Sequence, residues 1–190
     1  MVSKFTAKPE LAELAIELRN KFGLTVFVET GTLGGETTRW ASTHFATVYT
    51  IEKHPITASN AVGRLADCKN VTVIKGDSRQ KLKEVLDRIG NKRALLWLDA
   101  HLTGPAATTG ITDECALREE LRLVASCRVQ HCIFIDDAGW FFHARPSAAV
   151  DSTQWPDYKE IEKILAKWDL EILRGTNVIS ATPKVNSEGK

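Results

Sequence analysis

The chain has 190 residues, which is the usual size of one domain and enough to bury a core without disulfides. Hydrophobic residues make up 43% and charged residues 26%, a composition typical of globular rather than disordered proteins. Lysine and arginine number 25 against 24 acidic residues, so the net charge of +1 gives no support to a nucleic-acid or anionic-membrane binder. These numbers predict a single domain over residues 1–190, with flexible ends at 1–8 and 184–190.

The sequence shows no targeting or membrane-spanning pattern. The N-terminus, Met1 to Phe5, lacks the apolar stretch of a signal peptide, and no run approaches the ~18 apolar residues of a membrane span. The four cysteines have no CxxC spacing, which favours reduced thiols over a zinc site. We therefore expect a cytoplasmic protein with no membrane and no nucleic-acid partner, and the sequence leaves a homodimer open.

Helical and strand patterns alternate along the whole chain. Apolar residues at helical spacing predict helices, and short runs of β-branched, aromatic or aliphatic residues predict strands. The expected helices cover about 11–22, 36–44, 56–65, 82–89, 112–124 and 161–168. The expected strands cover about 25–28, 46–51, 71–74, 94–98 and 132–135, followed by a hairpin of 170–173 and 178–181.

This order of elements predicts the fold class. Gly23 is expected to end the first helix, and Thr112 to cap the fifth, with Asp113 and Glu114 in its first turn. Five β-α units in series imply an α/β protein with a Rossmann-like, seven-stranded and mostly parallel sheet, covered by helices on both faces. The closing hairpin adds antiparallel strands at the C-terminal edge. In such sheets, ligands bind outside the carboxyl ends of the strands, where the strand order reverses.

A glycine-rich turn follows the first strand. The dinucleotide fingerprint G-x-G-x-x-G fails here because Leu33 occupies the place of its second glycine. Glu29 at the strand end suits a cationic ammonium group better than a pyrophosphate. A plain tight turn is the alternative.

The next two strands also end in polar residues. Glu52 stands 21 residues beyond Gly31, where a carboxylate can accept both hydroxyls of a ribose; a solvated acid is the alternative. The small, polar turn Gly76–Ser78 follows the third strand and suits an adenine edge. Asp77 is equally well explained as a helix cap.

Three carboxylates follow the fourth and fifth strands. Asp99 ends one strand, and Asp136 and Asp137 end its neighbour, so like charges gather where a cation would neutralise them. An oxygen-rich site suits Mg²⁺, Ca²⁺ or Mn²⁺ more than Zn²⁺. Capping and loop hydrogen bonds are the alternative. His101 is a candidate metal ligand, general base or surface residue.

In chain order, the glycine turn with its carboxylate, then Glu52, Gly76–Ser78 and Asp99, resemble the motifs of class I S-adenosylmethionine-dependent methyltransferases. The similarity covers nearly the whole chain, including the C-terminal hairpin. Leu96–Asp99 together with Ile135–Asp137 resembles the metal-dependent O-methyltransferases of the catechol and macrocin types. Trp97–His101 together with Ile133–Ala138 also resembles a poorly characterised bacterial branch of methyltransferase-like proteins.

The resemblance implies roles for particular residues. The residues implied to bind S-adenosylmethionine are Glu29, Gly31, Gly35 and Thr37 at the methionine end, Glu52 at the ribose, Asp77 and Ser78 at the adenine, and Thr32 and Asp99 beside them. The implied ligands of a divalent cation, magnesium or else manganese or calcium, are Asp99, Asp136 and Asp137. His101 and Asp99 are the implied catalytic residues, His101 replacing a lysine base of the catechol type that has no counterpart motif here.

The implied function is a methyltransferase that O-methylates a small hydroxylated acceptor with the help of the cation. The cation would lower the pKa of the acceptor hydroxyl, His101 or an aspartate would take the proton, and the oxygen would attack the methyl group in line. Trp140, Phe141, Phe142 and His143 either wall the acceptor pocket or pack on the sheet rim. The alternatives are a metal-independent methyltransferase, a non-catalytic S-adenosylmethionine-binding module and a nicotinamide-dependent oxidoreductase.

Overall fold

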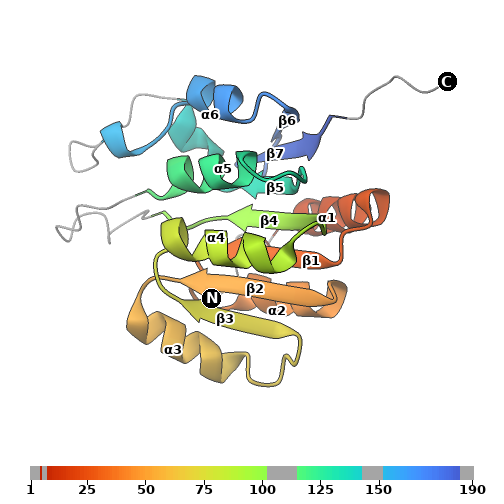
Figure 1. The fold of residues 1–190 in the computed structure, drawn as a ribbon, viewed down its shortest axis with the longest axis vertical. Helices are drawn as coiled ribbons and strands as arrows, with labels where there is room; N and C mark the ends of the chain where they lie inside the picture. The colour runs from red at the N-terminus through yellow and green to blue at the C-terminus, as the bar shows by residue number, and fades with distance from the viewer. Residues whose placement is uncertain (1–4, 6–7, 102–114, 143–151, 185–190) are drawn as a thin grey trace.

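The computed structural model describes residues 5, 8–101, 115–142 and 152–184. Seven strands form one sheet in the order β3-β2-β1-β4-β5-β7-β6 (Figure 1). The strands are β1 Val26–Thr30, β2 Thr47–Glu52, β3 Val71–Lys75, β4 Ala94–Leu98, β5 Cys132–Ile135, β6 Trp168–Leu173 and β7 Val178–Pro183. The helices are α1 Pro9–Phe22, α2 Glu36–His44, α3 Pro55–Arg64, α4 Ser78–Ile89, α5 Leu117–Ala125 and α6 Tyr158–Ile164, with 3₁₀ turns at Ala138–Phe141 and Ser152–Gln154.

The pairing of the strands confirms the predicted topology. Strands β1 to β5 pair in parallel, and β7 pairs antiparallel with both β5 and β6. The strand order reverses between β1 and β4, which are adjacent although β2 and β3 lie between them in the chain. The carboxyl ends of β1, β4 and β5 therefore meet at the switch point, where an α/β sheet leaves room for a ligand.

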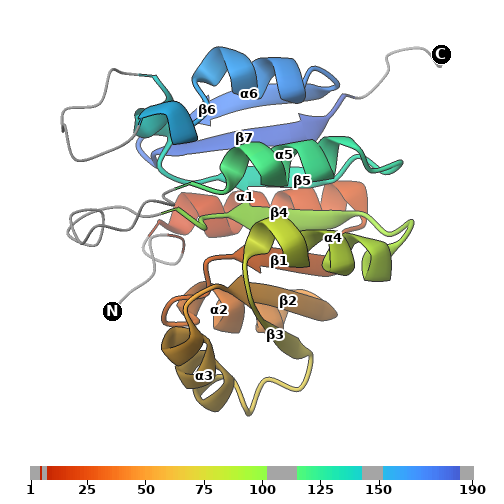
Figure 2. The same cartoon turned by 60° about the vertical axis from the view of Figure 1, so that its left-hand side comes forward.

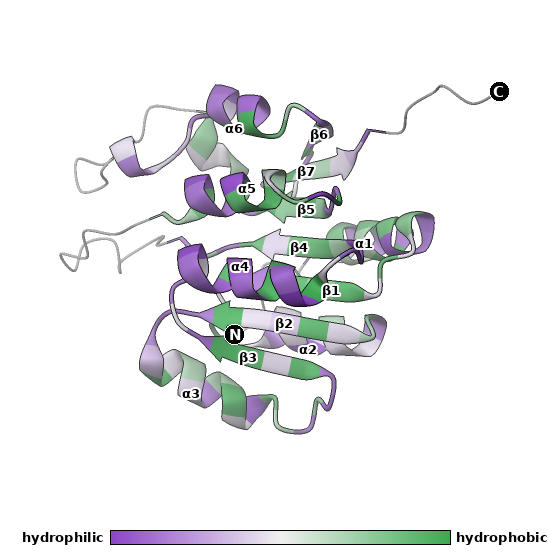
Figure 3. Cartoon of the chain, viewed as in Figure 1, coloured by the Kyte–Doolittle hydropathy of each residue, from purple (hydrophilic) through white to green (hydrophobic). Residues whose placement is uncertain are grey.

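Helices cover both faces of the sheet. Figures 1 and 2 show α1 and α2 behind the sheet and α4 and α5 in front of it. Consecutive side chains of a strand point to opposite faces, so Phe27 joins the core on the α1 side and Val28 the core on the α4 side. In Figure 3 these helices carry both hydrophilic and hydrophobic residues, as helices with one buried face should. No helix among the described residues is long and apolar enough to cross a membrane.

Several local expectations need correction. The fifth helix begins at Leu117 rather than near Thr112, and its cap position is Ala116; residues 112–114 lie outside the described part of the chain. Trp168 does not extend the last helix, because it is the first residue of β6. Phe5, in the stretch expected to be flexible, is fully buried against the ring of Trp97 at 4.9 Å between centroids.

The third helix also differs from its predicted pattern. Ile56 and Val62 were expected on its buried face, but they are 68% and 46% exposed. The residues that α3 buries are Ala58 and Ala61. Alanine lets a helix lie close to its neighbour. A face of small residues can therefore be the buried one, even where larger apolar residues lie on another face of the same helix.

Candidate functional site at the carboxyl ends of the strands

Backbone hydrogen bonds hold the carboxyl ends of the central strands together just beyond the sheet. The Gly31 amide donates to the Ile51 carbonyl at 2.9 Å, and the Asp99 amide donates to the Thr30 carbonyl at 3.1 Å. The Asp136 amide donates to the Leu98 carbonyl at 3.2 Å. The residues after β1, β4 and β5 therefore start from fixed positions.

The glycine turn after β1 has a steric requirement at Gly31. This residue has φ of +86°, and a Cβ placed on it would lie 2.5 Å from the backbone oxygen of Asp99. Only glycine allows the turn to approach β4 this closely. Gly35 has φ of +83° and is the N-cap of α2. Thr37, in the first turn of that helix, is buried. Leu33 also has a positive φ, +46°, and its side chain is 65% exposed.

Glu29 lies beneath this turn and is 2% exposed. Its Oε2 accepts hydrogen bonds from the Thr38 hydroxyl and, at 2.7 Å, from the Thr50 hydroxyl. The Thr50 and Thr32 hydroxyls lie 2.6 Å apart. Burial raises the pKa of Glu29 to about 7, against the opposing effect of the two threonine hydrogen bonds. The site thus has a buried acid that a nearby cation would turn into a carboxylate.

Glu52 joins the end of β2 to the glycine turn. Its Oε2 accepts the Leu33 amide at 3.0 Å, and its Oε1 accepts the His54 amide at 2.9 Å. A carboxylate has about four lone-pair positions, so each oxygen retains capacity for a further donor such as a ribose hydroxyl.

The turn after β3 shows Asp77 in the capping role that was one of its two interpretations. Asp77 accepts the Arg79 amide at 3.0 Å as the N-cap of α4, and it pairs with the side chains of Arg79 and Lys53. These cations, Arg79 foremost, hold the pKa of the Asp77 carboxyl far below its usual range. The Ser78 side chain is buried at the start of α4.

Three side chains from the ends of β4 and β5 form a cluster with metal-ligand chemistry. Ligand atoms of Asp99, His101 and Asp137 all lie within 4.8 Å of one another. His101 Nε2 is 3.2 Å from Asp137 Oδ2 and 3.7 Å from Asp99 Oδ1. The His101 side chain is 1% exposed, so its interpretation as a surface residue is wrong.

The acids after β5 have separate positions. Asp137 has φ of +55°, an αL conformation that turns its side chain toward His101, and its Oδ1 accepts the Asn177 amide nitrogen at 3.2 Å. Asp136 is fully buried and is not part of the cluster formed by the other three side chains. Its assignment as a ligand stays a prediction.

Two aromatic rings pack beside His101. The Trp155 ring lies 5.2 Å from the imidazole and the Phe141 ring 6.5 Å from it. Trp140 stacks on Trp155 at 5.4 Å, whereas Phe142 packs on Tyr158. His143, the fourth expected wall residue, lies outside the described residues.

Arg118 fixes the segment that carries Trp155. Its guanidinium donates to both carboxylate oxygens of Glu160, at 2.8 and 3.0 Å, and to the carbonyl of Trp155 at 3.1 Å. It also donates to the carbonyls of Thr153 and Gln154. No motif pointed to Arg118, because its partners come from a distant part of the sequence.

The backbone of His101 is held as well. His101 forms an isolated antiparallel bridge with Cys115, so the chain leaves this point after His101 and returns to it 14 residues later. The cluster therefore lies beside the point where His101 and Cys115 are joined.

Glu120 is a buried acid that is not among the site residues predicted from the sequence. It is 1% exposed and lies beside the hydroxyls of Ser78 and Thr30, and burial raises its pKa to about 7. Its Oε1 makes no hydrogen bond to any described residue. The signal was present: Glu120 stands three residues after Leu117 and four before Val124, on the apolar face of α5.

Comparison with solved structures finds the same architecture in methyltransferases. An O-methyltransferase of Bacillus cereus in complex with S-adenosylhomocysteine gives a TM-score of 0.60 at 16% identity, over 93% of this chain and 82% of that one. A Podospora anserina methyltransferase bound to S-adenosylhomocysteine gives 0.61 at 12%, over 96% and 85%. A Streptomyces achromogenes O-methyltransferase involved in tomaymycin synthesis, in complex with S-adenosylmethionine, gives 0.57 at 18%, over 93% and 81%. No protein-family model and no curated protein matches the sequence.

These similarities extend over most of both chains, but the identities of 12% to 18% establish the fold alone. They agree with the resemblance carried by the strand-end motifs, which include Gly31, Glu52 and Asp99. This chain has the fold of the class I S-adenosylmethionine-dependent O-methyltransferases.

Proposed function

We propose that this chain is an S-adenosylmethionine-dependent methyltransferase that uses a divalent cation to methylate a hydroxyl of a small acceptor. The observation that carries the proposal is the cluster of Asp99, His101 and Asp137 beside the glycine turn, at the switch point of the sheet. The cofactor side and the metal side of this arrangement are supported by separate sets of residues.

The residues around the glycine turn fit S-adenosylmethionine. Gly31 keeps the turn free of a side chain, and Glu29 offers a buried carboxyl that an ammonium group would ionise. Glu52 presents its carboxylate at the end of the next strand, where ribose hydroxyls would bind. We assign the adenine to the Gly76–Ser78 turn, which the Asp77 cap holds in shape.

The cluster fits a divalent cation by its donor chemistry. Two carboxylates and an imidazole nitrogen are ligands that Mg²⁺, Mn²⁺ and related ions accept, with nitrogen shifting the preference toward the transition metals. The His101 Nε2 lies between the two carboxylates, which favours the ligand role for His101 over that of a base. The Asn177 side chain donates a hydrogen bond to Asp137 Oδ1, and metal ligands in proteins commonly have such a second partner.

The chain's own residues would divide the reaction between them. When bound, the cation lowers the pKa of an acceptor hydroxyl and S-adenosylmethionine supplies the methyl group. Among the three cluster side chains Asp99 is the most open, at 28% exposed against 1% and 8%, so it is the one placed to accept the hydroxyl proton. The rings of Trp155 and Phe141 exclude water from the His101 side and would orient an apolar part of the acceptor.

The experiment measures cofactor and metal binding in the same protein. S-adenosylmethionine and NADH are titrated calorimetrically, and Mn²⁺ binding is followed with and without a chelator. We expect S-adenosylmethionine to bind more tightly than NADH, and Asp137→Asn to weaken Mn²⁺ binding roughly tenfold or more without unfolding the protein. The matched control is Asp169→Asn, which removes an exposed carboxylate from β6.

Each alternative gives a different result. Tighter binding of NADH would overturn the methyltransferase assignment. Methyl transfer that survives both Asp137→Asn and the chelator would identify a metal-independent enzyme. Bound cofactor with no transfer to catechols, sugars or polyols, in the presence of Mg²⁺ or Mn²⁺, would favour a non-catalytic binding module.

A further inference from the structure

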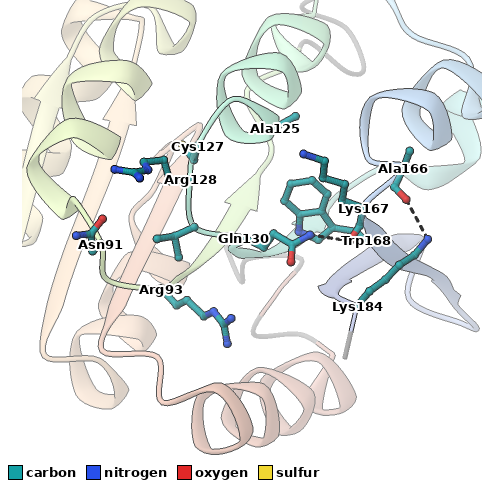
Figure 4. A pocket seen from close by; sticks show the side chains of 11 residues that line it. Asn91, Arg93, Ala125, Cys127, Arg128, Gln130, Ala166, Lys167, Trp168 and Lys184 are labelled. Atoms are coloured by element: carbon teal, nitrogen blue, oxygen red, sulfur yellow. Dashed lines mark hydrogen bonds between the residues drawn. The ribbon is translucent and has the colours of Figure 1, made fainter. Parts of the chain in front are cut away.

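A second concave site lies at the opposite edge of the sheet, where β4, β5 and β6 begin. It is a depression of about 750 Å³ (Figure 4). Its walls come from the segments that precede β4 and β5, the start of β6 and the residue after β7. The strand-end cluster proposed to bind the metal lies at the other end of these strands, so the depression belongs to a different site.

All the charged residues that line the depression are basic. Its ionisable lining residues, apart from Cys127, are Arg93, Arg128, Lys167 and Lys184, and no carboxylate is among them. No ion pair joins any of these four side chains to an acid in the described part of the chain. Asp169 follows the lining residue Trp168 in β6, but neighbouring strand residues face opposite sides.

The positive charge acts on its surroundings. Burial, and to a smaller extent the charge of Arg93, lower the pKa of His131 to about 4. Four cations around one concavity repel one another, and a bound anion would relieve that repulsion. The chain as a whole has a net charge of only +1, so this local excess is not a property of the whole surface.

The walls of the depression are held in place without a ligand. The Gln130 side chain donates to the Lys167 carbonyl at 2.7 Å, and the Lys184 ammonium donates to the Ala166 carbonyl at 2.9 Å. The Trp168 indole donates to the His131 carbonyl at 2.7 Å, which fixes a buried ring at the base of the wall. A preformed site loses little conformational entropy on binding.

We propose that this depression binds a small anion that carries two or more phosphate groups. Arginine and lysine are the residues that bind phosphate in proteins, arginine through paired hydrogen bonds and lysine as a point charge. Figure 4 shows the four basic side chains spread around the depression instead of gathered at one point. That spacing suits a chain of phosphates better than a single one, and Val129 and Ala125 offer an apolar surface to an organic part.

The test uses inorganic triphosphate and ATP as probes of the full-length protein. Binding is followed by calorimetry and by the indole N–H resonance of Trp168, at low and at physiological salt. We expect both probes to bind and to shift that resonance, with affinity falling as salt rises because the four cations are exposed. Arg128→Gln with Lys167→Gln should weaken triphosphate binding roughly tenfold.

A matched control removes the same charge elsewhere. Lys69→Gln with Lys159→Gln takes two exposed cations from the surface outside the depression, and triphosphate binding should stay within about twofold of that of the unmodified protein. Equal losses in the two double variants would mean general charge attraction and would overturn the proposal, as would absence of triphosphate binding. If S-adenosylmethionine displaces ATP but not triphosphate, ATP binds at the strand-end site and triphosphate binds in the depression. Preference for ATP over triphosphate without such competition would identify a nucleotide as the ligand.

Discussion

Glu29 and Glu120 are buried carboxyls on opposite faces of β1, since Glu29 contacts Thr38 of α2 and Glu120 lies beside Thr30. Both have a pKa raised to about 7 by burial. Glu29 was expected from its place at the end of a strand, within a motif. Glu120 was not expected to be buried, because the apolar spacing that predicts the helix takes no account of a single acid on the same face.

At the residue scale, the titration of Glu29 should make the proposed binding of S-adenosylmethionine depend on pH. An ammonium group binds the ionised carboxyl, so affinity for S-adenosylmethionine should rise several-fold between about pH 6 and pH 7.5 as Glu29 loses its proton. The groups facing it are the hydroxyls of Thr38 and Thr50 and the carboxyls of Glu52 and Glu36. Calorimetric titration across this range checks the rise. Glu29→Gln should bind more weakly and show a flat profile; an unchanged slope in that variant would exclude Glu29 as the cause.

At the element scale, the sequence predicts the strands of the sheet well, but it predicts the segments that connect them less well. The strand β4 was predicted with its exact bounds, Ala94–Leu98, because five consecutive apolar residues are what a strand covered on both faces requires. The start of α5 was not predicted correctly. A capping pattern around Thr112 is a local signal, whereas the bridge from His101 to Cys115, which precedes α5, forms only in the folded chain.

The turn after β1 gives a test with an internal control. Gly31→Ala puts a methyl group 2.5 Å from the Asp99 oxygen, and Gly23→Ala has the same sign of φ with open space around it. Gly23→Ala should cost about 1 kcal/mol in free energy of unfolding, and Gly31→Ala about 3 kcal/mol or more, with weaker Mn²⁺ binding as Asp99 is displaced. Urea unfolding measures both values. Equal costs would show that the turn and β4 can separate without loss.

The Arg118 contacts predict a cost for exchanging one cation for another. Arg118→Lys keeps the charge but loses the fork that joins Glu160 to the Trp155 segment, so it should lower the free energy of unfolding by about 2 kcal/mol. It should also change the near-ultraviolet circular dichroism of the Trp140–Trp155 stack. Arg122→Lys is the control, because Arg122 pairs with the same Glu160 at 3.5 Å and is 60% exposed; its effect should stay near 0.5 kcal/mol or less, as is typical of exposed pairs, on the order of 0.2–1 kcal/mol. A similar loss in both variants would contradict the role of the fork.

At the scale of the whole molecule, the alternation of patterns was enough to predict the sheet and its hairpin. The motifs also located the strand ends that carry Asp99 and Asp137. What they could not predict are contacts between segments far apart in sequence, such as Asn177 with Asp137 or Arg118 with Glu160. Such contacts have no local pattern, because each residue by itself is typical of a solvated surface.

The two buried acids together predict how global stability varies with pH. Both bind protons more tightly in the folded chain than in the unfolded one, so the folded state holds the extra protons between about pH 4.5 and pH 7 and stability falls as pH rises through that window. Glu120→Gln removes the part of this pH-dependent loss of stability that is due to Glu120. At pH 8 the free energy of unfolding should therefore rise by as much as about 3 kcal/mol, and at pH 4 it should change little. Denaturant unfolding at several pH values tests this. Glu119→Gln, on the same helix but partly exposed, is the control; a gain at pH 8 no larger than that of the control would count against the prediction.

The bridge between His101 and Cys115 makes the stability of the sheet largely independent of the length of the connection between these two residues. Because both ends of the connection from β4 to Cys115 are joined beside the cluster, its intervening residues can change in length or composition at a small entropic cost to the fold. Sequences of different length grafted between His101 and Cys115 are therefore expected to leave the sheet and the cluster of Asp99, His101 and Asp137 as they are.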